Sequence, residues 1–149
     1  MTTTTTVSTV PSTVPSADRS TDPSTVAGDV LARLERAWND ADGAAFGRVY
    51  APGSSFVTIR GEHIVGSTAI GAGHDGIFTT IYAGSVNRME LVRAEKIADG
   101  VVLAVSLNTL DCPTGPLAGR HQAMSTSVVT RRPDGGWDVT ATHNTLLAG

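Results

Sequence analysis

The feature that most constrains the fold of this chain is a change of hydrophobic period at Gly84. Before Gly84, most apolar residues recur at three- and four-residue spacing, which is the pattern of amphipathic helices. After Gly84 the period becomes extended, and strands are predicted at about 86–98, 101–110, 121–132 and 137–146. Helices followed by a strand meander indicate the α+β class rather than alternating α/β. Such a meander is antiparallel and can bury one face under the helices.

Two helices are predicted before the first strand. Asp22 is followed by Pro23, which is the combination of an N-cap and a proline at the first helical position. Apolar residues at helical spacing then continue to about residue 39. Asp42 can cap a second, shorter helix, which Pro52 ends. The apolar face of this second helix consists of Phe46, Val49 and Tyr50.

A third helix is predicted to start at Ser67, which can act as its N-cap, and to end at Gly84. Ahead of this helix, residues 55–59 and 63–65 form two short strands on either side of a turn. The apolar face of the third helix consists of Ile70, His74, Ile77, Phe78 and Ile81.

The third helix contains the sequence GAGHDG at 71–76, which has the glycine spacing of a dinucleotide-binding loop. Such a loop follows a buried strand and opens a helix inside a βαβ unit. The motif here lies several residues inside a helix, so nucleotide binding is not expected. These glycines instead predict close packing of the helix on the sheet, or a cavity wall with little side chain.

Composition sets the domain boundary and excludes several kinds of partner. Residues 1–22 are dominated by Thr, Ser, Val, Pro and Ala, which predicts a disordered tail and leaves 23–149 as one α+β domain. The net charge is -3 and no basic stripe occurs, so nucleic acid is not an expected partner. The longest clean apolar run, 101–105, is too short to cross a bilayer, so a membrane partner is not expected either.

Cysteine and histidine usage gives no sign of a cofactor. The single cysteine, Cys112, cannot form an intrachain disulfide, which fits a cytoplasmic location, and nothing near it supplies the base that a catalytic thiol needs. The four histidines lack the spacing of metal ligands, and nicotinamide, flavin and haem motifs are absent from the sequence. Neither a metal nor another cofactor is therefore expected. Carboxylate pairs suited to acid/base catalysis are also missing from the sequence.

Two histidines are the candidates for catalysis. His74 lies on the apolar face of the third predicted helix, and His143 lies in the last predicted strand. Alternation along that strand places His143 on the more apolar face with Trp137, whereas Thr142 and Asn144 fall on the outward face. Both imidazoles are therefore expected to face one shared pocket. Each is either a core histidine with a hydrogen-bond partner or a group that moves protons.

Short motifs spread over about residues 24–147 resemble those of a known family. They are AWNDAD at 37–42, Phe46, YAP at 50–52, SFVT at 55–58, GSTAI at 66–70, His74, GGW at 135–137 and HNT at 143–145. The first of these motifs resemble the start of the SnoaL-like group of the nuclear-transport-factor-two-like (NTF2-like) superfamily. The others look most like its SgcJ/EcaC branch, some members of which sit in gene clusters for enediyne antibiotics.

The resemblance implies a cone-shaped half-barrel, in which a curved, mostly antiparallel sheet and three N-terminal helices enclose a deep pocket. It also implies a homodimer. Relatives include polyketide cyclases, a steroid isomerase, dehydratases and non-enzymatic binders. The expected function is therefore that of a pocket protein of secondary metabolism, which acts on or binds a hydrophobic polyketide or enediyne intermediate.

Two classes of function remain open for such a pocket. If the protein is an enzyme, cofactor-free acid/base chemistry is expected, with His74 and His143 moving protons. If it is not, the pocket holds or carries a reactive polyene, or the chain is an accessory subunit. In either case the expected contacts to a substrate are Trp38, Tyr50, Phe56, Phe78 and Asn144. The homodimer is expected to form through the outer face of the sheet, where Thr140, Thr142 and Asn144 alternate outward.

Overall fold

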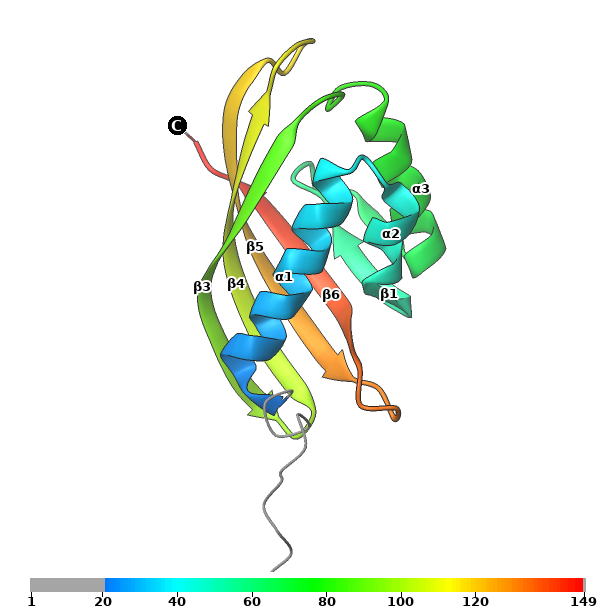
Figure 1. The fold of residues 1–149 in the computed structure, drawn as a ribbon, viewed down its shortest axis with the longest axis vertical. Helices are drawn as coiled ribbons and strands as arrows, with labels where there is room; N and C mark the ends of the chain where they lie inside the picture. Colours follow the sequence, from blue (N-terminus) through cyan, green and yellow to red (C-terminus); the bar gives the residue numbers. More distant parts are fainter. Residues whose placement is uncertain (1–20, 149) are drawn as a thin grey trace, which may run out of the picture.

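A computed structural model describes residues 21–148, and it shows one curved, unclosed sheet with helices on one side (Figure 1). Its six strands lie in the order β2-β1-β6-β5-β4-β3. The helices are α1 (Pro23–Asn39), α2 (Gly43–Arg48) and α3 (Ser67–Phe78). The strands are β1 (Tyr50–Val57), β2 (His63–Val65), β3 (Val86–Ala98), β4 (Val101–Cys112), β5 (Gly119–Arg131) and β6 (Trp137–Leu146). The predicted α+β class is confirmed.

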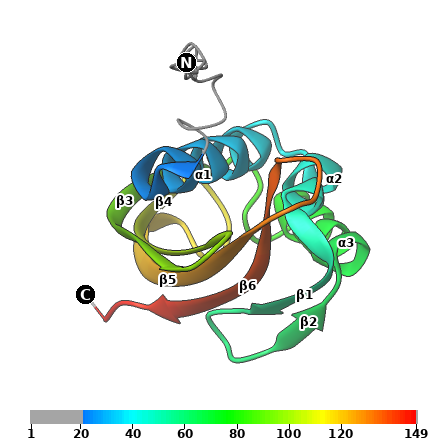
Figure 2. The ribbon, with the colours of Figure 1, turned by 90° about the horizontal axis from the view of Figure 1, so that it is seen from below.

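The sheet is antiparallel except at one strand pair. The four long strands β3 to β6 pair antiparallel in chain order, and β2 pairs antiparallel with β1. β1 instead runs parallel to β6, although most of the sequence of the domain separates the two strands. Seen from below, the long strands curl around α1, while α2 and α3 lie beside β1 (Figure 2). The inner face of the curved sheet is therefore the one that the helices cover.

The first helix begins and ends where the sequence predicts. Asp22 caps α1, and its carboxylate accepts a 3.0 Å hydrogen bond from the backbone N–H of Thr25. Each Val or Leu side chain that is fully buried contributes about 1.5–3 kcal/mol to folding, so a buried helix face attaches α1 firmly to the sheet. The buried residues of this face are Val26, Ala27, Val30, Leu31, Leu34, Ala37 and Trp38.

The predicted tail at 1–22 falls almost wholly on residues 1–20, which lie outside the described residues. Asp22 itself belongs to the cap of α1. Within residues 21–148, none of the helices has both the length and the apolar composition needed to cross a membrane.

Two helices are shorter than predicted. α2 ends at Arg48, so Tyr50 is the first residue of β1 rather than part of a helical face. α3 ends at Phe78, and a series of turns leads from there to Gly84. Gly84 has a φ of 72°, a left-handed conformation that favours glycine. It marks the entry into β3, where the sequence predicts the change of period.

The N-cap of α3 also differs from the prediction. Gly66 occupies the N-cap with a φ of 94°, and no side chain caps the helix there. The hydroxyl of Ser67 instead donates a hydrogen bond of 2.5 Å to the backbone oxygen of Gly47. This hydrogen bond ties the start of α3 to α2.

Glycines bring α2 and α3 unusually close together. A Cβ atom at Gly71 would lie 2.8 Å from the backbone oxygen of Gly43, and one at Gly47 would lie 2.9 Å from the Cα of Gly71. The backbone N–H of Gly43 also donates to the carboxylate of Asp75 at 2.7 Å. The glycine motif at 71–76 therefore permits close packing, as predicted, although its main contact is α2 rather than the sheet.

A β-bulge in β6 exchanges the two faces of that strand. Val139 pairs with Val129 and Ala141 pairs with Val128, so Thr140 is an extra residue between the two pairs. Because side chains alternate along a strand, one extra residue moves all the following side chains to the opposite face. The alternation predicted for this strand therefore holds up to Val139 and is wrong beyond the bulge.

Candidate functional site

A cavity of about 330 Å³ lies between the helices and the inner face of the sheet. This volume falls in the range of small-molecule sites. Phe78 does not line the cavity but packs behind it against Trp38, with 5.0 Å between the ring centroids. The predicted site residues that line the cavity are Trp38, Tyr50, Phe56, His74 and Asn144.

His74 sits in a cage of aromatic rings on the helix side of the cavity. Its imidazole stacks on Phe46 with 3.9 Å between the centroids, and it meets the rings of Phe56 and Trp38 edge-on at 5.2 and 5.9 Å. Nδ1 lies 2.7 Å from the backbone oxygen of Ile70, one helical turn earlier. Since a carbonyl oxygen only accepts, Nδ1 carries the proton. Nε2 is then a bare acceptor, without a hydrogen-bond partner among residues 21–148.

Burial keeps His74 uncharged. The side chain is 5% exposed, and desolvation lowers its pKa to about 4, despite the opposing effects of the Ile70 carbonyl and Asp75. At neutral pH the ring is therefore neutral and offers the lone pair of Nε2 to the cavity. A base with so low a pKa removes a proton poorly, because general bases work best when their pKa lies near the working pH.

Tyr50 lines the cavity from β1. Its hydroxyl lies 3.3 Å from that of Thr142, which in turn lies 2.9 Å from the hydroxyl of Ser127. Burial raises the pKa of Tyr50 well above its usual value, so the phenol stays protonated. The three hydroxyl groups belong to β1, β6 and β5, and they form one of two polar networks on the inner face of the sheet.

The second network crosses the inner face from β4 to β1. The hydroxyl of Ser106 donates to Asn108, the amide of Asn108 donates to Ser125, and the hydroxyl of Ser125 donates to Asn144. The amide of Asn144 then donates to the backbone oxygen of Val57 at 2.9 Å. We call this series the Ser106–Val57 chain. Its four side chains all line the cavity.

Asn87 on β3 adds a polar group that has no partner. Its backbone N–H and C=O are both held by the side-chain amide of Asn39, at 2.8 and 3.0 Å. Its own side chain is 5% exposed, and its Oδ1 is buried without a hydrogen-bond partner among the described residues. Asn87 lines the cavity, so its side-chain amide lies beside the space that a bound molecule would fill.

Apart from Tyr50 and Asn144, these polar residues were not singled out from the sequence, although the signal for them is present. Ser106 and Asn108 fall at the same alternation phase of β4 as the buried residues Val102 and Ala104. Polar residues at inward positions of a strand mark either a hydrogen-bonded core or a site. Asn87 has the inward phase of β3 in the same way.

Charged groups lie at the mouth of the cavity. Arg60 and Glu62 are exposed residues of the turn between β1 and β2, and Glu62 is the one carboxylate among the described lining residues. Tyr82 is half-buried beside them, and its pKa is raised mainly by burial. Within residues 21–148, no three His, Cys, Asp or Glu side chains come together as a metal site.

The structure does not bring His143 to the cavity. His143 is exposed, pairs with Thr126 across the sheet, and lies on the outer face. The prediction that it shares a pocket with His74 is wrong, because the bulge at Thr140 reverses the alternation. For the same reason Thr142 is buried and lines the cavity, so it cannot belong to a flat outer face.

Comparisons with known proteins place this fold. No protein-family model matches the chain, and a search of the curated proteins gives no match either. Among solved structures, a protein with a cystatin-like fold from Caulobacter vibrioides is 28% identical, with a TM-score of 0.71 over 85% of this chain and 92% of that one. An NTF2-like protein with a cystatin-like fold from Novosphingobium aromaticivorans is 18% identical, with a TM-score of 0.67 over 81% and 79% of the two chains.

A ketosteroid isomerase-like protein from Erwinia carotovora atroseptica is also similar, with 12% identity and a TM-score of 0.72 over 87% of this chain and 99% of that one. At these identities the likeness shows the fold. The chain therefore has the cystatin-like fold of NTF2-like proteins, as its sequence motifs predict. The comparisons do not distinguish the SgcJ/EcaC branch within this larger group.

Proposed function

We propose that this protein binds a small, largely apolar molecule in its cavity and holds it without acid/base chemistry. The observation that carries the proposal is the state of the buried lining. Its two fully buried ionisable residues, His74 and Tyr50, are both neutral at pH 7, since burial lowers the pKa of one and raises the pKa of the other. His121 and Tyr82 also line the cavity but are only half-buried. The exposed charges of Arg60 and Glu62 remain at the mouth.

A binder fits this lining better than an enzyme does. The cyclases and isomerases that the sequence resembles use a pocket carboxylate to carry a proton. The described lining has one carboxylate, Glu62, and it is exposed to water. His74 is the buried alternative, and a pKa of about 4 leaves it a weak base.

The compound class forms the finer part of the proposal. The motifs shared with the SgcJ/EcaC branch support a polyketide of secondary metabolism as the ligand, with enediyne intermediates as the particular case. The aromatic wall of Trp38, Phe46 and Phe56 suits an unsaturated carbon chain, because such rings pack well against flat π-systems.

Binding is tested with retinol, a neutral conjugated polyene. The Trp137→Phe variant leaves Trp38 as the single tryptophan, so its quenching reports on the cavity. Saturable quenching is expected in this background. Ala123→Phe, which fills the cavity, should weaken it at least tenfold, whereas the same substitution at Ala141 on the outer face should not. Equal quenching in both variants, or conversion of retinol that depends on His74, would contradict the proposal.

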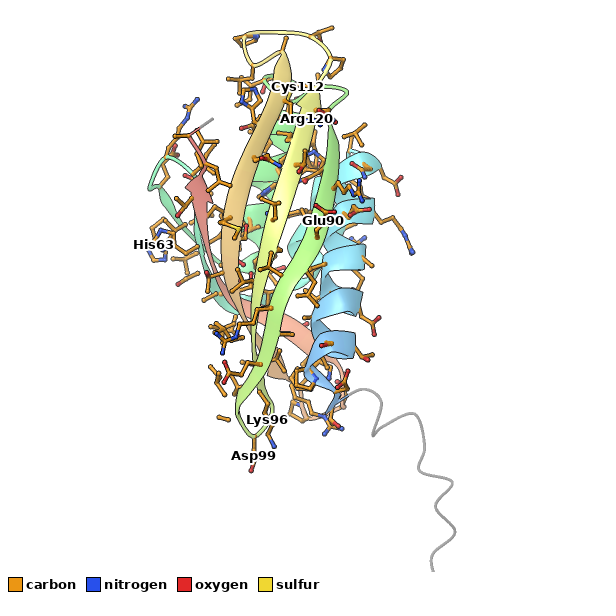
Figure 3. All side chains as sticks on the ribbon, turned by 90° about the vertical axis from the view of Figure 1, so that its left-hand side faces the viewer. His63, Glu90, Lys96, Asp99, Cys112 and Arg120 are labelled. Carbon is orange, nitrogen blue, oxygen red and sulfur yellow. The ribbon has the colours of Figure 1, made fainter. Side chains whose placement is uncertain are left out.

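We also propose a homodimer through the outer face of the sheet, for which the structure offers different residues from those predicted. The apolar outer residues of β4 and β5 are Val101, Leu103, Val105, Leu107, Met124 and Val128. Pairing through the edge strand β3 is disfavoured by its ion pairs, Arg88–Glu90, Arg93–Glu95 and Lys96–Asp99. Figure 3 shows Glu90, Lys96 and Asp99 along this edge and at its end.

Light scattering tests the dimer with a pair of lysine substitutions. Leu107→Lys places a charge in the centre of the outer face, so it should halve the mass measured for the wild type. Ala72→Lys adds the same charge on the exposed side of α3 and should leave the mass unchanged. A monomeric wild-type protein would contradict the proposal.

A further inference from the structure

The Ser106–Val57 chain has a fixed direction, because it ends on a backbone carbonyl. The oxygen of Val57 only accepts, so the NH₂ group of Asn144 must donate to it. The Oδ1 of Asn144 is therefore the atom that meets Ser125, and it accepts the hydroxyl proton of that serine. This assignment of the Asn144 amide follows from chemistry and not from the position of any hydrogen.

The same logic continues to the other end of the chain. Since Ser125 has used its proton, its oxygen accepts from the Nδ2 of Asn108 at 2.7 Å. The Oδ1 of Asn108 then accepts the proton of Ser106 at 3.0 Å. Ser106 is 3% exposed and lines the cavity, and only its oxygen lone pairs remain to meet a bound molecule. The Ser106–Val57 chain therefore presents an acceptor, the oxygen of Ser106, at its β4 end.

Two further acceptors complete the buried wall. Asn87 Oδ1 has no partner among residues 21–148 and lies on β3, next to the strand of Ser106. His74 Nε2 faces the sheet residues from the helix side, since its Nδ1 proton is held by Ile70. A buried acceptor without a partner is costly, so His74 Nε2 and Asn87 Oδ1 favour a donor on the ligand. Ser106 Oγ already donates to Asn108, and its lone pairs can accept from a further donor.

The buried lining also disfavours a charged ligand. None of the buried lining residues among those described is ionised at neutral pH, so an anion or cation in the inner cavity would lose its hydration without gaining a partner. The ligand must therefore supply donors from neutral groups, of which hydroxyl is the most common in apolar natural molecules.

We propose that the ligand is an uncharged, largely apolar molecule with at least two hydroxyl or N–H donors. One donor meets His74 Nε2 on the helix side, and another meets Asn87 Oδ1 or Ser106 Oγ on the sheet side. This inference rests on the proposed function, since it specifies the class of molecule that the same cavity binds.

Calorimetric titration of the full chain at pH 7 tests the inference with three probes of similar shape. The probes are 2,6-dihydroxynaphthalene, its dimethyl ether and the corresponding dicarboxylate. The diol should bind at least tenfold more tightly than the ether, because a site built for a hydroxyl discriminates against an analogue without one. The dicarboxylate should bind more weakly than both.

Two variants test which acceptors of the protein meet the donors of the ligand. His74→Phe and Asn87→Leu should each lower the preference for the diol over the ether about tenfold, and binding of the ether should persist. His143→Phe is the control for His74→Phe, because it makes the same change at an exposed histidine. It should keep the wild-type preference for the diol over the ether. Thr126→Val removes an exposed hydroxyl from the outer face and is the control for Asn87→Leu, so it should also keep the wild-type preference.

The outcomes separate the inference from the proposed function. Failure of all three probes to bind would overturn both. Binding of the ether as tight as that of the diol, or tighter binding of the dicarboxylate, would overturn the inference and leave an apolar binding cavity standing. If a variant fails to fold, the comparison of probes on the wild-type chain still decides the matter.

Discussion

The inner and outer faces of the β4–β6 sheet are made of the same residue types and behave differently. Ser125 and Thr142 on the inner face are buried and hydrogen-bonded, whereas Thr126 and His143, one position further along each strand, are exposed on the outer face. The difference depends on the phase of the alternation and not on the chemistry of the side chain. A polar residue in a strand therefore gains its role from its phase, and a bulge can change that phase.

The two candidate histidines illustrate the same contrast. His74 is enclosed by four aromatic rings and has one nitrogen fixed by the helix backbone. His143 lies beyond the bulge and meets water. Its predicted burial depended on an unbroken alternation from Trp137, which Thr140 interrupts.

A one-residue deletion beyond the bulge should have the largest effect on this comparison. Deletion of His143 would bring Asn144 to an outward position, so Ser125 and the backbone oxygen of Val57 would lose the partner that Asn144 supplies. Each buried polar group left unpaired costs about 1–3 kcal/mol, so a loss of about 3 kcal/mol or more is expected in urea unfolding. Deletion of Thr140 removes only the extra residue, so Ala141 would still pair with Val128 and Thr142 would still face the cavity. This second deletion should cost much less. Equal losses in the two variants would contradict the role assigned to the bulge.

The pH dependence of stability should separate the two histidines next. A pKa lowered from 6.5 to about 4 means that the unfolded chain binds the proton before the folded chain does. The stability linked to His74 is therefore present in full above pH 6.5 and is lost as the pH falls toward 4. This loss is about 3 kcal/mol.

Unfolding measured from pH 7 to pH 4 checks this expectation. His74→Phe should remove about 3 kcal/mol of the pH dependence, and His143→Phe should retain all of it. A wild-type curve parallel to that of His74→Phe would show that the ring becomes protonated in the folded protein without cost.

A smaller effect is expected from neighbouring hydroxyls on the two faces. Ser125→Ala breaks the Ser106–Val57 chain and leaves the Nδ2 of Asn108 and the Oδ1 of Asn144 without a partner, so it should cost about 1–3 kcal/mol. Thr126→Val changes an exposed side chain and should stay within about 0.5 kcal/mol. Similar losses at the two positions would mean that the inner chain adds little to the stability of the sheet.

Much of the fold can be predicted from the sequence because its signals are local. The N-cap at Asp22, the alternation in β4 and the turn residue Gly84 each act over a few positions, and each is found where predicted. The position of His74 on a buried helix face is predictable for the same reason. Helical spacing is regular, so the sequence places His74 on the same buried face as Ile70 and Phe78.

The remaining site depends on contacts between distant strands. No pattern within β6 reveals that Thr140 is an extra residue, since a bulge is defined by the pairing with β5. The unpaired state of Asn87 depends in the same way on what β4 and α1 leave uncovered. Such features arise from register and packing, and the alternation within a single strand does not reveal either of them.

The parallel pairing of β1 with β6 has a consequence for the order of folding. Tyr50 pairs with Val139, and Val57 pairs with His143, so the wall of the cavity is joined from chain segments made far apart in time during synthesis. Until β6 has been made, β1 can pair only with β2 and is not joined to the long strands, and the Ser106–Val57 chain lacks Asn144. Contacts of such long range slow folding because the loop between them must close first. Among the described elements, the wall of the cavity is therefore completed last, when β6 joins β1 to the long strands.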